Sequence, residues 1–248
     1  MKKILYKIFT LVAALSFVAC GELSTEGIST ITYFVVLELE GGDQYVELGS
    51  SYTDPGFTAT EDGVDVASTV ETSGDVNTSK VGVYPVSYYV ENSDGYSTTA
   101  SRNVFVYDPA YAGVAASEIT GTYTLSSASY REITGSATQD TFVTDDNGLS
   151  YSNFVVTVSE VCTGVYFVSD FSGAWFKTYK AYGSSYNMSG YITLDSSNVI
   201  EPLYFTTISG WEAYEGALAN GTFDEATSTL TWDYDFGGEM AFHIELTK

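Results

Sequence analysis

The stretch Tyr84-Pro-Val-Ser-Tyr-Tyr-Val90 has apolar or aromatic side chains at its first, third, fifth and seventh positions. A repeat of two residues places such side chains on one face of a β-strand, against a hydrophobic core. Asn92-Ser-Asp-Gly95 follows, and Asn, Asp and Gly are residues that tight hairpin turns favour. Arg102-Asn-Val-Phe-Val106 then alternates in the same way. The sequence therefore predicts two strands of a half-buried β-sheet.

The composition of the whole chain indicates an all-β protein. Tyr and Phe are abundant, at 21 and 14 residues, whereas Lys and Arg together number nine. Aromatic and β-branched residues favour strands, and no long segment has helical periodicity. Alternation also follows Ile31, where apolar Leu37 precedes acidic Glu38. About seven short strands fit into residues 31–107, which predicts a β-sandwich of immunoglobulin (Ig) type without the disulfide of antibody domains.

The first 19 residues have the organisation of a secretory signal. Lys2 and Lys3 precede an apolar run, and a small residue, Ala19, stands before Cys20. Such signals have a basic start, an apolar core and small residues at the cleavage site. The run is too short to span a membrane as a helix, which needs about 20 apolar residues. Its end, Leu15-Ser-Phe-Val-Ala-Cys20, is typical of a lipobox.

Under this interpretation Cys20 becomes the first residue of the mature protein. Several acyl chains on Cys20 would then anchor the protein in a membrane, and the small, polar residues 20–30 would form a flexible tether. The alternative is an ordinary secretory signal followed by a chance cysteine. The second cysteine, Cys162, would have no partner in the mature chain, and its strand-like surroundings predict an inert, buried thiol.

The chain is strongly acidic, with a formal net charge of -23. Removal of residues 1–19 takes away three lysines and no acid, which leaves -26. A charge of this sign repels phosphate backbones, so we expect no nucleic-acid partner. It also opposes a flat association with anionic lipids. We interpret the charge as an aid to solubility at a crowded cell surface.

A second β-domain is expected from residue 119 to residue 248. Residues 108–118 are rich in small residues and lack alternation, which predicts a linker. Ile119-Thr-Gly-Thr-Tyr123 opens the domain, and Asn220-Gly221 supplies a turn. About eight antiparallel strands in this length favour a β-barrel or a barrel-like sandwich. The strand-like runs are residues 154–160, 164–169, 188–194, 199–205, 228–236 and 240–246.

The first domain carries a spaced set of motifs, namely Tyr52-Thr-Asp-Pro-Gly56 with Ala59, Val81-Gly-Val-Tyr-Pro-Val-Ser-Tyr88, Asn92-Ser-Asp-Gly95 and Arg102-Asn-Val-Phe-Val106. Through these motifs, nearly all of residues 40–107 resembles the bacterial surface Ig-like domains of secreted and cell-surface proteins. The resemblance implies a spacer or presentation module without catalytic residues. The motif positions themselves are turn and core residues, which agrees with that role.

The order of the domains carries a second resemblance. A lipoprotein signal and one Ig-like domain precede a β-domain with Gly121-Thr-Tyr123, Val168-Ser-Asp-Phe-Ser-Gly173 and Thr229-Leu-Thr-Trp232. This organisation is similar to that of accessory lipoproteins of SusC/SusD-like outer-membrane importers. The resemblance implies an outer-membrane lipoprotein that faces the cell exterior and assists the capture of glycans or peptides. Gly121-Thr-Tyr123 is also similar to the opening of lipocalin-like barrels.

Residues for catalysis or metal binding are scarce. The single histidine, His243, lies in an alternating run on the polar face with Glu245, which predicts a solvent-facing strand residue. One His and one free Cys cannot supply the ligands of a zinc site. Two carboxylates suffice for a glycosidase, but with 32 acids a chance pair carries little information. We therefore predict no catalytic residues, no metal site and no cofactor.

Aromatic side chains are the candidates for ligand binding. Sugars bind to flat aromatic faces with polar groups nearby. Trp175 and Trp211 each follow a glycine in an irregular stretch, as loop-presented aromatics do. With Tyr214, they form the predicted ligand-binding set. Trp232 alternates with Leu230 and is expected in the core.

Four functions remain open from the sequence. The first is a non-catalytic surface lipoprotein, with the Ig-like domain as a stalk and the C-terminal domain binding a polysaccharide or peptide or docking on an importer. The second is a purely structural importer subunit without its own ligand. The third is a carrier of a small apolar molecule in the lumen of the C-terminal barrel. The fourth is a hydrolase with a pair of acids.

Overall fold

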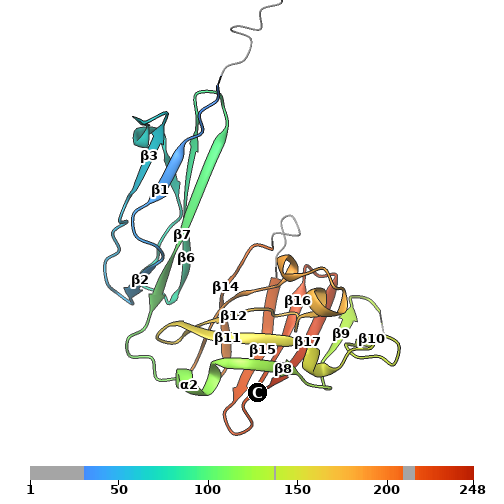
Figure 1. The fold of residues 1–248 in the computed structure, drawn as a ribbon. Helices are drawn as coiled ribbons and strands as arrows, with labels where there is room; N and C mark the ends of the chain where they lie inside the picture. Colours follow the sequence, from blue (N-terminus) through green and yellow to red (C-terminus); the bar gives the residue numbers. More distant parts are fainter. Residues whose placement is uncertain (1–30, 137, 209–215) are drawn as a thin grey trace, which may run out of the picture.

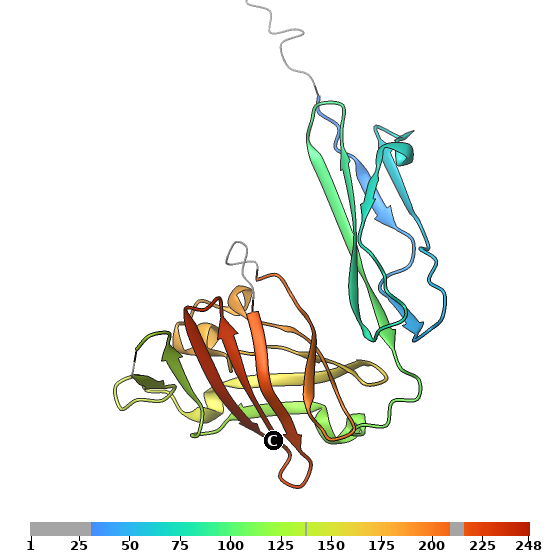
Figure 2. The ribbon, with the colours of Figure 1, turned by 180° about the vertical axis from the view of Figure 1, so that it is seen from behind.

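The computed structural model describes residues 31–136, 138–208 and 216–248, which form two β-domains, and one end of the elongated first domain lies against the side of the second (Figures 1 and 2). The first domain is a sandwich of a three-stranded sheet, in the order β1-β3-β4, and a four-stranded sheet, in the order β2-β7-β6-β5. Strand β2 pairs with β7 in parallel. These strands are β1 (Val36–Leu39), β2 (Gln44–Glu47), β3 (Phe57–Glu61), β4 (Val64–Asp65), β5 (Glu71–Ser73), β6 (Gly82–Glu91) and β7 (Ser97–Tyr107).

The two predicted strands are confirmed as the β6–β7 hairpin, which forms the centre of the four-stranded sheet of the Ig-like domain. The two strands pair in antiparallel register from Gly82↔Val106 to Glu91↔Ser97. Asn92 fixes the turn, because its buried side-chain oxygen accepts hydrogen bonds from the backbone N–H groups of Asp94 and Tyr96, at 3.1 and 2.7 Å. The turn motif is therefore held by an asparagine side chain, as expected for an Asx-type turn.

A buried arginine joins the two sheets of this domain. Arg102 is 2% exposed, and its guanidinium donates hydrogen bonds of 2.6 Å to the carbonyl oxygens of Glu40 and Gly56. It also lies 3.7 Å from the carboxylate of Asp54. Asp54 accepts further hydrogen bonds from the hydroxyl of Tyr88 and from the N–H of Gly56. The Tyr52–Gly56 motif and Arg102 therefore form one polar network across the sandwich.

The second domain is a ten-stranded sheet that curls into an open barrel. Its main order is β10-β9-β17-β8-β11-β12-β13-β14, and the β15–β16 hairpin continues the sheet beyond β17. The two ends approach at the isolated bridge Val199↔Thr222. The strands are β8 (Gly121–Leu125), β9 (Tyr130–Ile133), β10 (Gln139–Thr141), β11 (Val155–Cys162), β12 (Val165–Val168), β13 (Gly190–Leu194), β14 (Ile200–Phe205), β15 (Gly216–Asp224), β16 (Thr229–Phe236) and β17 (Met240–Thr247).

Side chains fill the interior of this barrel. Phe142, Phe154, Phe171 and Phe242 are each 0% exposed and belong to one continuous core. The expectation for Trp232 is confirmed, since it is 1% exposed and its indole N–H donates a 2.8 Å hydrogen bond to the carbonyl of Phe171. Interiors packed in this way resemble close-packed solids. The described core therefore gives no support to a lumen that carries an apolar ligand.

Residues 108–118, expected to be a linker, contribute to the second domain. They contain Val114, which is 4% exposed, and the start of a short helix, α2 (Ala116–Ile119). The hydroxyl of Tyr166 donates a 3.2 Å hydrogen bond to the carbonyl of Val114. The four alanines and one glycine suggested a spacer, yet Val114 and one hydrogen bond attach this segment to the core. Among the described residues, no helix has the length and apolar character needed to cross a membrane.

Asp170 is a buried acid in the loop that follows β12. It is 1% exposed, and one carboxyl oxygen accepts hydrogen bonds from the N–H and the hydroxyl of Ser172, at 2.9 and 2.7 Å. Burial raises the pKa of this carboxyl from 3.8 to about 6, because desolvation of the ionised form outweighs these hydrogen bonds. The folded state therefore binds this proton more tightly than the unfolded state does. The contribution of protonated Asp170 to the free energy of unfolding is complete below about pH 4 and is lost as the pH rises through about 6.

The substitution Asp170→Asn is expected to remove this pH dependence from the C-terminal domain. The ionisation of Asp170 should cost about 3 kcal/mol of the free energy of unfolding between pH 4 and pH 8. Urea denaturation followed by tryptophan fluorescence reports on this domain, because all three tryptophans lie in residues 119–248. The difference between parent and variant should grow with pH in favour of the variant. Parallel curves at pH 4, 6 and 8 would contradict the assignment.

Candidate functional site

The two domains meet through an aromatic contact, which we call the interdomain cluster. Val83 and Phe105 of the Ig-like domain pack against Val165 of β12, and all three are less than 7% exposed. The Phe105 ring meets Tyr191 of β13 edge-on, with centroids 5.2 Å apart, and stacks on Tyr45 at 5.4 Å. The outer face of the barrel is therefore apolar where it abuts the Ig-like domain. The contact buries Phe105 and Val165 between the two domains.

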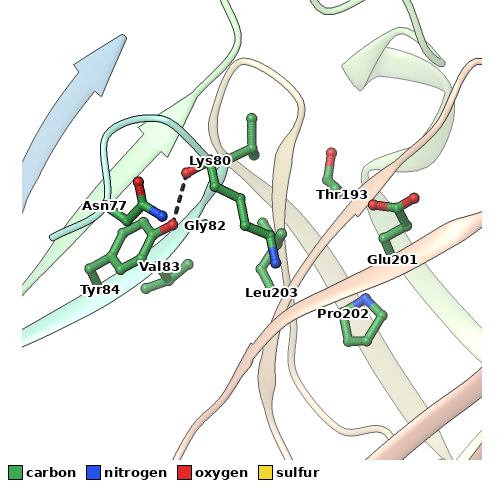
Figure 3. Close-up of a pocket in the computed structure, with 10 residues that line it drawn as sticks. Asn77, Lys80, Gly82, Val83, Tyr84, Thr193, Glu201, Pro202 and Leu203 are labelled. Carbon is green, nitrogen blue, oxygen red and sulfur yellow. Dashed lines mark hydrogen bonds between the residues drawn. The ribbon is translucent and has the colours of Figure 1, made fainter. Parts of the chain in front are cut away.

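A cleft of about 370 Å³ lies beside the interdomain cluster (Figure 3). Its Ig-like wall comes from the segment before β6 and from the start of β6, and its opposite wall comes from β13 and β14. Alternation explains the second wall, because Ile192 and Leu194 point into the barrel core and leave Thr193 on the outer face. The lining residues are Asn77, Lys80, Val81, Gly82, Val83, Tyr84, Thr193, Glu201, Pro202 and Leu203.

Polar groups of opposite charge face each other across the cleft. Lys80 reaches from the Ig-like wall towards Leu203 and Pro202, and Glu201 lies on the far wall beside Thr193 (Figure 3). Lys80 and Glu201 are exposed, and within the described residues Lys80 forms no ion pair. The hydroxyl of Tyr84 donates a 2.9 Å hydrogen bond to the carbonyl of Lys80, which fixes the backbone from which the lysine extends. The cleft thus has a polar rim and an apolar floor.

This arrangement offers groups that can bind a ligand. A polar rim over an apolar floor can hold hydroxyl, amide or amine groups while carbon atoms contact Pro202, Leu203 and Tyr84. Among the lining residues, Glu201 is the one carboxylate, whereas a glycosidase needs two. Across the described parts of the chain, no group of three or more His, Cys, Asp or Glu residues is arranged to hold a metal ion.

The structure corrects the expected presentation of Trp175. This residue begins the π-helix η3 (Trp175–Tyr179) and is 1% exposed. The Tyr179 ring stacks on it at 4.0 Å, and the guanidinium of Arg131 lies 4.6 Å from its ring centroid. The glycine before Trp175 indicated a surface loop, but the turn folds the indole into the end of the barrel. Trp211 and Tyr214, the other members of the predicted set, lie outside the described residues.

Lys80, Tyr84 and Glu201 were not predicted from the sequence as residues of a site. One signal was present, since Lys80 is the only lysine between residues 8 and 176. An isolated cation in so acidic a chain marks a surface that differs from the rest. The position of Glu201 opposite Lys80 depends on how the two domains pack, and no local pattern contains that information.

His243 lies on the outer face of β17, as predicted, but it is partly covered rather than freely solvated. Its Nδ1 is 2.6 Å from the carboxylate of Asp233, and its Nε2 is 3.6 Å from Glu132. The imidazole stacks on the ring of Tyr130, with centroids 4.2 Å apart. These neighbours come from the strands on either side, so the contacts are cross-strand pairs that stabilise the sheet.

Cys162 is half-buried at the interdomain cluster and is a free thiol. Burial, with a smaller effect of Glu160, raises the pKa of its thiol to about 11. The thiol is therefore protonated at neutral pH, which makes it a poor nucleophile and a poor metal ligand.

Comparison with known proteins finds a matching family for each domain. A model of the Ig-like domain of bacterial surface proteins matches residues 37–106, and a model of the BT2262-like C-terminal domain matches residues 112–248. No curated protein matches the chain. The crystal structure of the lipoprotein BT2262 from Bacteroides thetaiotaomicron is 29% identical, with a TM-score of 0.45, and the match covers 87% of this chain and 100% of that one.

Two structures from Clostridium perfringens ZmpB match more distantly. One contains CBM51-2 in complex with GlcNAc and INT domains, and the other contains the M60 catalytic domain with two CBM51 domains. They are 16% and 20% identical, with TM-scores of 0.28, and the matches cover 54% and 56% of this chain. The chain spans only 31% and 14% of their lengths. The BT2262-like model covers more than half of the present chain, so this protein belongs to the family with a BT2262-like C-terminal domain, here preceded by a bacterial surface Ig-like domain.

Proposed function

We propose that the protein is a non-catalytic lipoprotein of the outer surface that binds a polar oligomer, a glycan or a peptide, in the cleft between its domains. Cys20 would anchor it in the outer membrane, and the Ig-like domain would carry the C-terminal domain away from the bilayer. It would serve as an accessory component of a SusC/SusD-like importer. The cleft carries the proposal, because a cation and a carboxylate face each other there above an apolar floor.

The packing of the domains favours this use of the cleft. The interdomain cluster fixes both walls before any ligand arrives, so little ordering entropy opposes binding. A single Lys80 and a single Glu201 leave the lining close to electrically neutral. Such a site suits uncharged or zwitterionic chains better than polyanions, which the charge of the whole protein repels.

The double substitution Lys80→Gln with Glu201→Gln tests the cleft. Each charged group that hydrogen-bonds the ligand contributes about 1.5–3 kcal/mol, so loss of both should weaken binding roughly a hundredfold or more. Isothermal calorimetry against panels of neutral polysaccharides and of peptides would first identify a ligand and then measure the loss. Lys180→Gln is the matched control, because Lys180 is an exposed lysine outside the lining. Unchanged affinity in the double variant would move binding away from the cleft. No binding to either panel would favour a structural subunit.

A further inference from the structure

The end of the Ig-like domain that lies away from the C-terminal domain carries an exposed apolar surface. We call it the tip patch and define it as Ile31, Tyr33, Phe34 and Tyr96. Their exposed fractions are 75%, 44%, 59% and 54%. The Phe34 and Tyr96 rings lie 5.5 Å apart, which makes the surface continuous across two segments of the chain. Single exposed apolar residues are common on proteins, but a grouped set at one end calls for a partner.

The tip patch is held in shape by the hairpin turn beneath it. The side-chain amide of Asn92 donates a 2.7 Å hydrogen bond to the carbonyl of Tyr33, and its oxygen accepts one from the N–H of Tyr96. Asn92 is 6% exposed, so these bonds are shielded from water. One buried side chain therefore fixes both halves of the patch. A patch ordered in advance loses little conformational freedom when it is covered.

The position of the patch identifies its partner. The described chain begins at Ile31, at the end of the Ig-like domain remote from the barrel (Figures 1 and 2). Cys20, the proposed lipid anchor, is eleven residues earlier. Eleven residues span about 40 Å at most, and about 18 Å if they form the tether that the sequence predicts. An anchored protein would thus keep the patch next to the bilayer surface.

We propose that the tip patch inserts its rings into the interfacial layer of the bilayer to which Cys20 is attached. This inference rests on the proposed anchor. Tyr and other amphipathic rings prefer that layer, because the ring enters the acyl boundary while the hydroxyl stays among headgroups. The tether is a poor alternative cover, since residues 21–30 offer only Leu23 and Ile28 as large apolar side chains. A lipid anchor together with inserted rings would set the orientation of the stalk.

Charges around the patch determine which lipids it would accept. Asp94 lies in the turn, and Glu61 accepts hydrogen bonds from the N–H and the hydroxyl of Ser93, at 3.0 and 2.6 Å. Within the Ig-like domain the cations are Lys80 and Arg102, which are committed to the cleft and to the core. These carboxylates disfavour anionic headgroups and leave zwitterionic ones as the preferred surface.

The test places a fluorescent reporter in the patch. The Phe34→Trp variant of the lipidated full chain is reconstituted in phosphatidylcholine vesicles whose acyl chains carry bromine near the headgroup, and the emission of the parent is subtracted. Emission should fall relative to vesicles without bromine, and the loss should shrink when Tyr96→Ser is added or when anionic lipid is mixed in. Tyr182→Trp is the matched control, because Tyr182 is 53% exposed in the other domain. Its emission should not change.

Each other result would overturn the inference in a recognisable way. If the parent pellets with vesicles and the Phe34→Trp emission is unaffected by bromine, the anchor stands and the insertion is refuted. If the parent does not pellet, and Cys20→Ala behaves identically, both the anchor and the insertion fail. If the Phe34→Trp emission is already blue-shifted in Cys20→Ala protein without vesicles, the patch is covered by protein, either the tether or a second copy.

Discussion

The substitution Arg102→Met is expected to lower the free energy of unfolding of the Ig-like domain by about 3–5 kcal/mol, because it removes two hydrogen bonds from a buried charged group, each worth about 1.5–3 kcal/mol. The guanidinium satisfies two carbonyl oxygens and faces the carboxylate of Asp54. Met fills much of the same volume but donates to neither carbonyl and removes the positive charge that faces Asp54. Arg102→Lys should recover part of the loss, because one ammonium cannot reach both carbonyls with the geometry of the guanidinium fork.

Scanning calorimetry would separate the two domains in this experiment. Tryptophan fluorescence follows the C-terminal domain alone, since the Ig-like domain has no tryptophan, and should change little. Lys80→Met is the control, because Lys80 is the other cation of the domain and is exposed. If Arg102→Met lowers the unfolding temperature of the Ig-like domain no more than Lys80→Met does, the network contributes nothing to stability.

The same network makes the stability of the Ig-like domain depend on pH in the acid range. Burial alone would raise the pKa of Asp54, but hydrogen bonds from Tyr88 and Gly56 and the charge of Arg102 bring it below its usual 3.8. A lowered folded-state pKa contributes stability above the unfolded-state pKa, and this contribution disappears as the pH falls through the lowered value. Without the charge of Arg102, the pKa of Asp54 is lowered less. The free energy of unfolding of the Arg102→Met variant should therefore fall less than that of the parent as the pH drops below 5.

The substitution Phe105→Ala is expected to uncouple the two domains. Phe105 is 1% exposed and contacts Tyr191 of the C-terminal domain, so its removal leaves a cavity in the interdomain cluster. Loss of a buried Phe side chain costs about 3–5 kcal/mol. Because the contact joins two domains, we expect the loss to appear largely as freedom of one domain relative to the other.

Small-angle X-ray scattering would detect that freedom as a larger radius of gyration and a broader distance distribution. Any ligand of the cleft should also bind more weakly, since the walls would no longer be fixed. Tyr89→Ala provides the comparison, because Tyr89 lies on the same hairpin but is 38% exposed and remote from the second domain. A scattering curve identical to that of the parent would refute the role of Phe105 as the link.

Features that depend on local pattern were predictable from the sequence. The β6–β7 hairpin, the two β-domains and the burial of Trp232 follow from alternation and turn residues, which act over a few positions. Arg102 was visible as part of a motif, but its burial was not. An arginine in a strand usually lies outside, and only the meeting of Glu40, Asp54 and Gly56 around it makes the inside favourable.

Features that depend on tertiary packing were not predictable. Trp175 stands in a glycine-containing, irregular stretch, which indicates a surface loop, yet Arg131 and Tyr179 enclose it. The cleft requires the contact of two domains, so neither half of the sequence contains it. A partial signal existed in Tyr166 and Phe167, since large rings on both faces of one strand indicate that both faces are covered. Tyr166 packs in the barrel, and Phe167 packs against Tyr191.

The pairing of β17 has a consequence for biogenesis. This strand binds β16 on one side, and β8 and β9 on the other, with Leu246 opposite Leu125. Strands β8 and β17 are thus neighbours although they are far apart in sequence, so the barrel core cannot close until β17 has left the export channel. The Ig-like domain has no such dependence and can form as soon as β7 emerges. Pairing between strands far apart in sequence slows folding. During export the Ig-like domain would therefore be folded while the C-terminal domain is still unfolded and prone to aggregate. The rate at which β17 pairs with its neighbouring strands would then determine how long the C-terminal domain is at risk of aggregation.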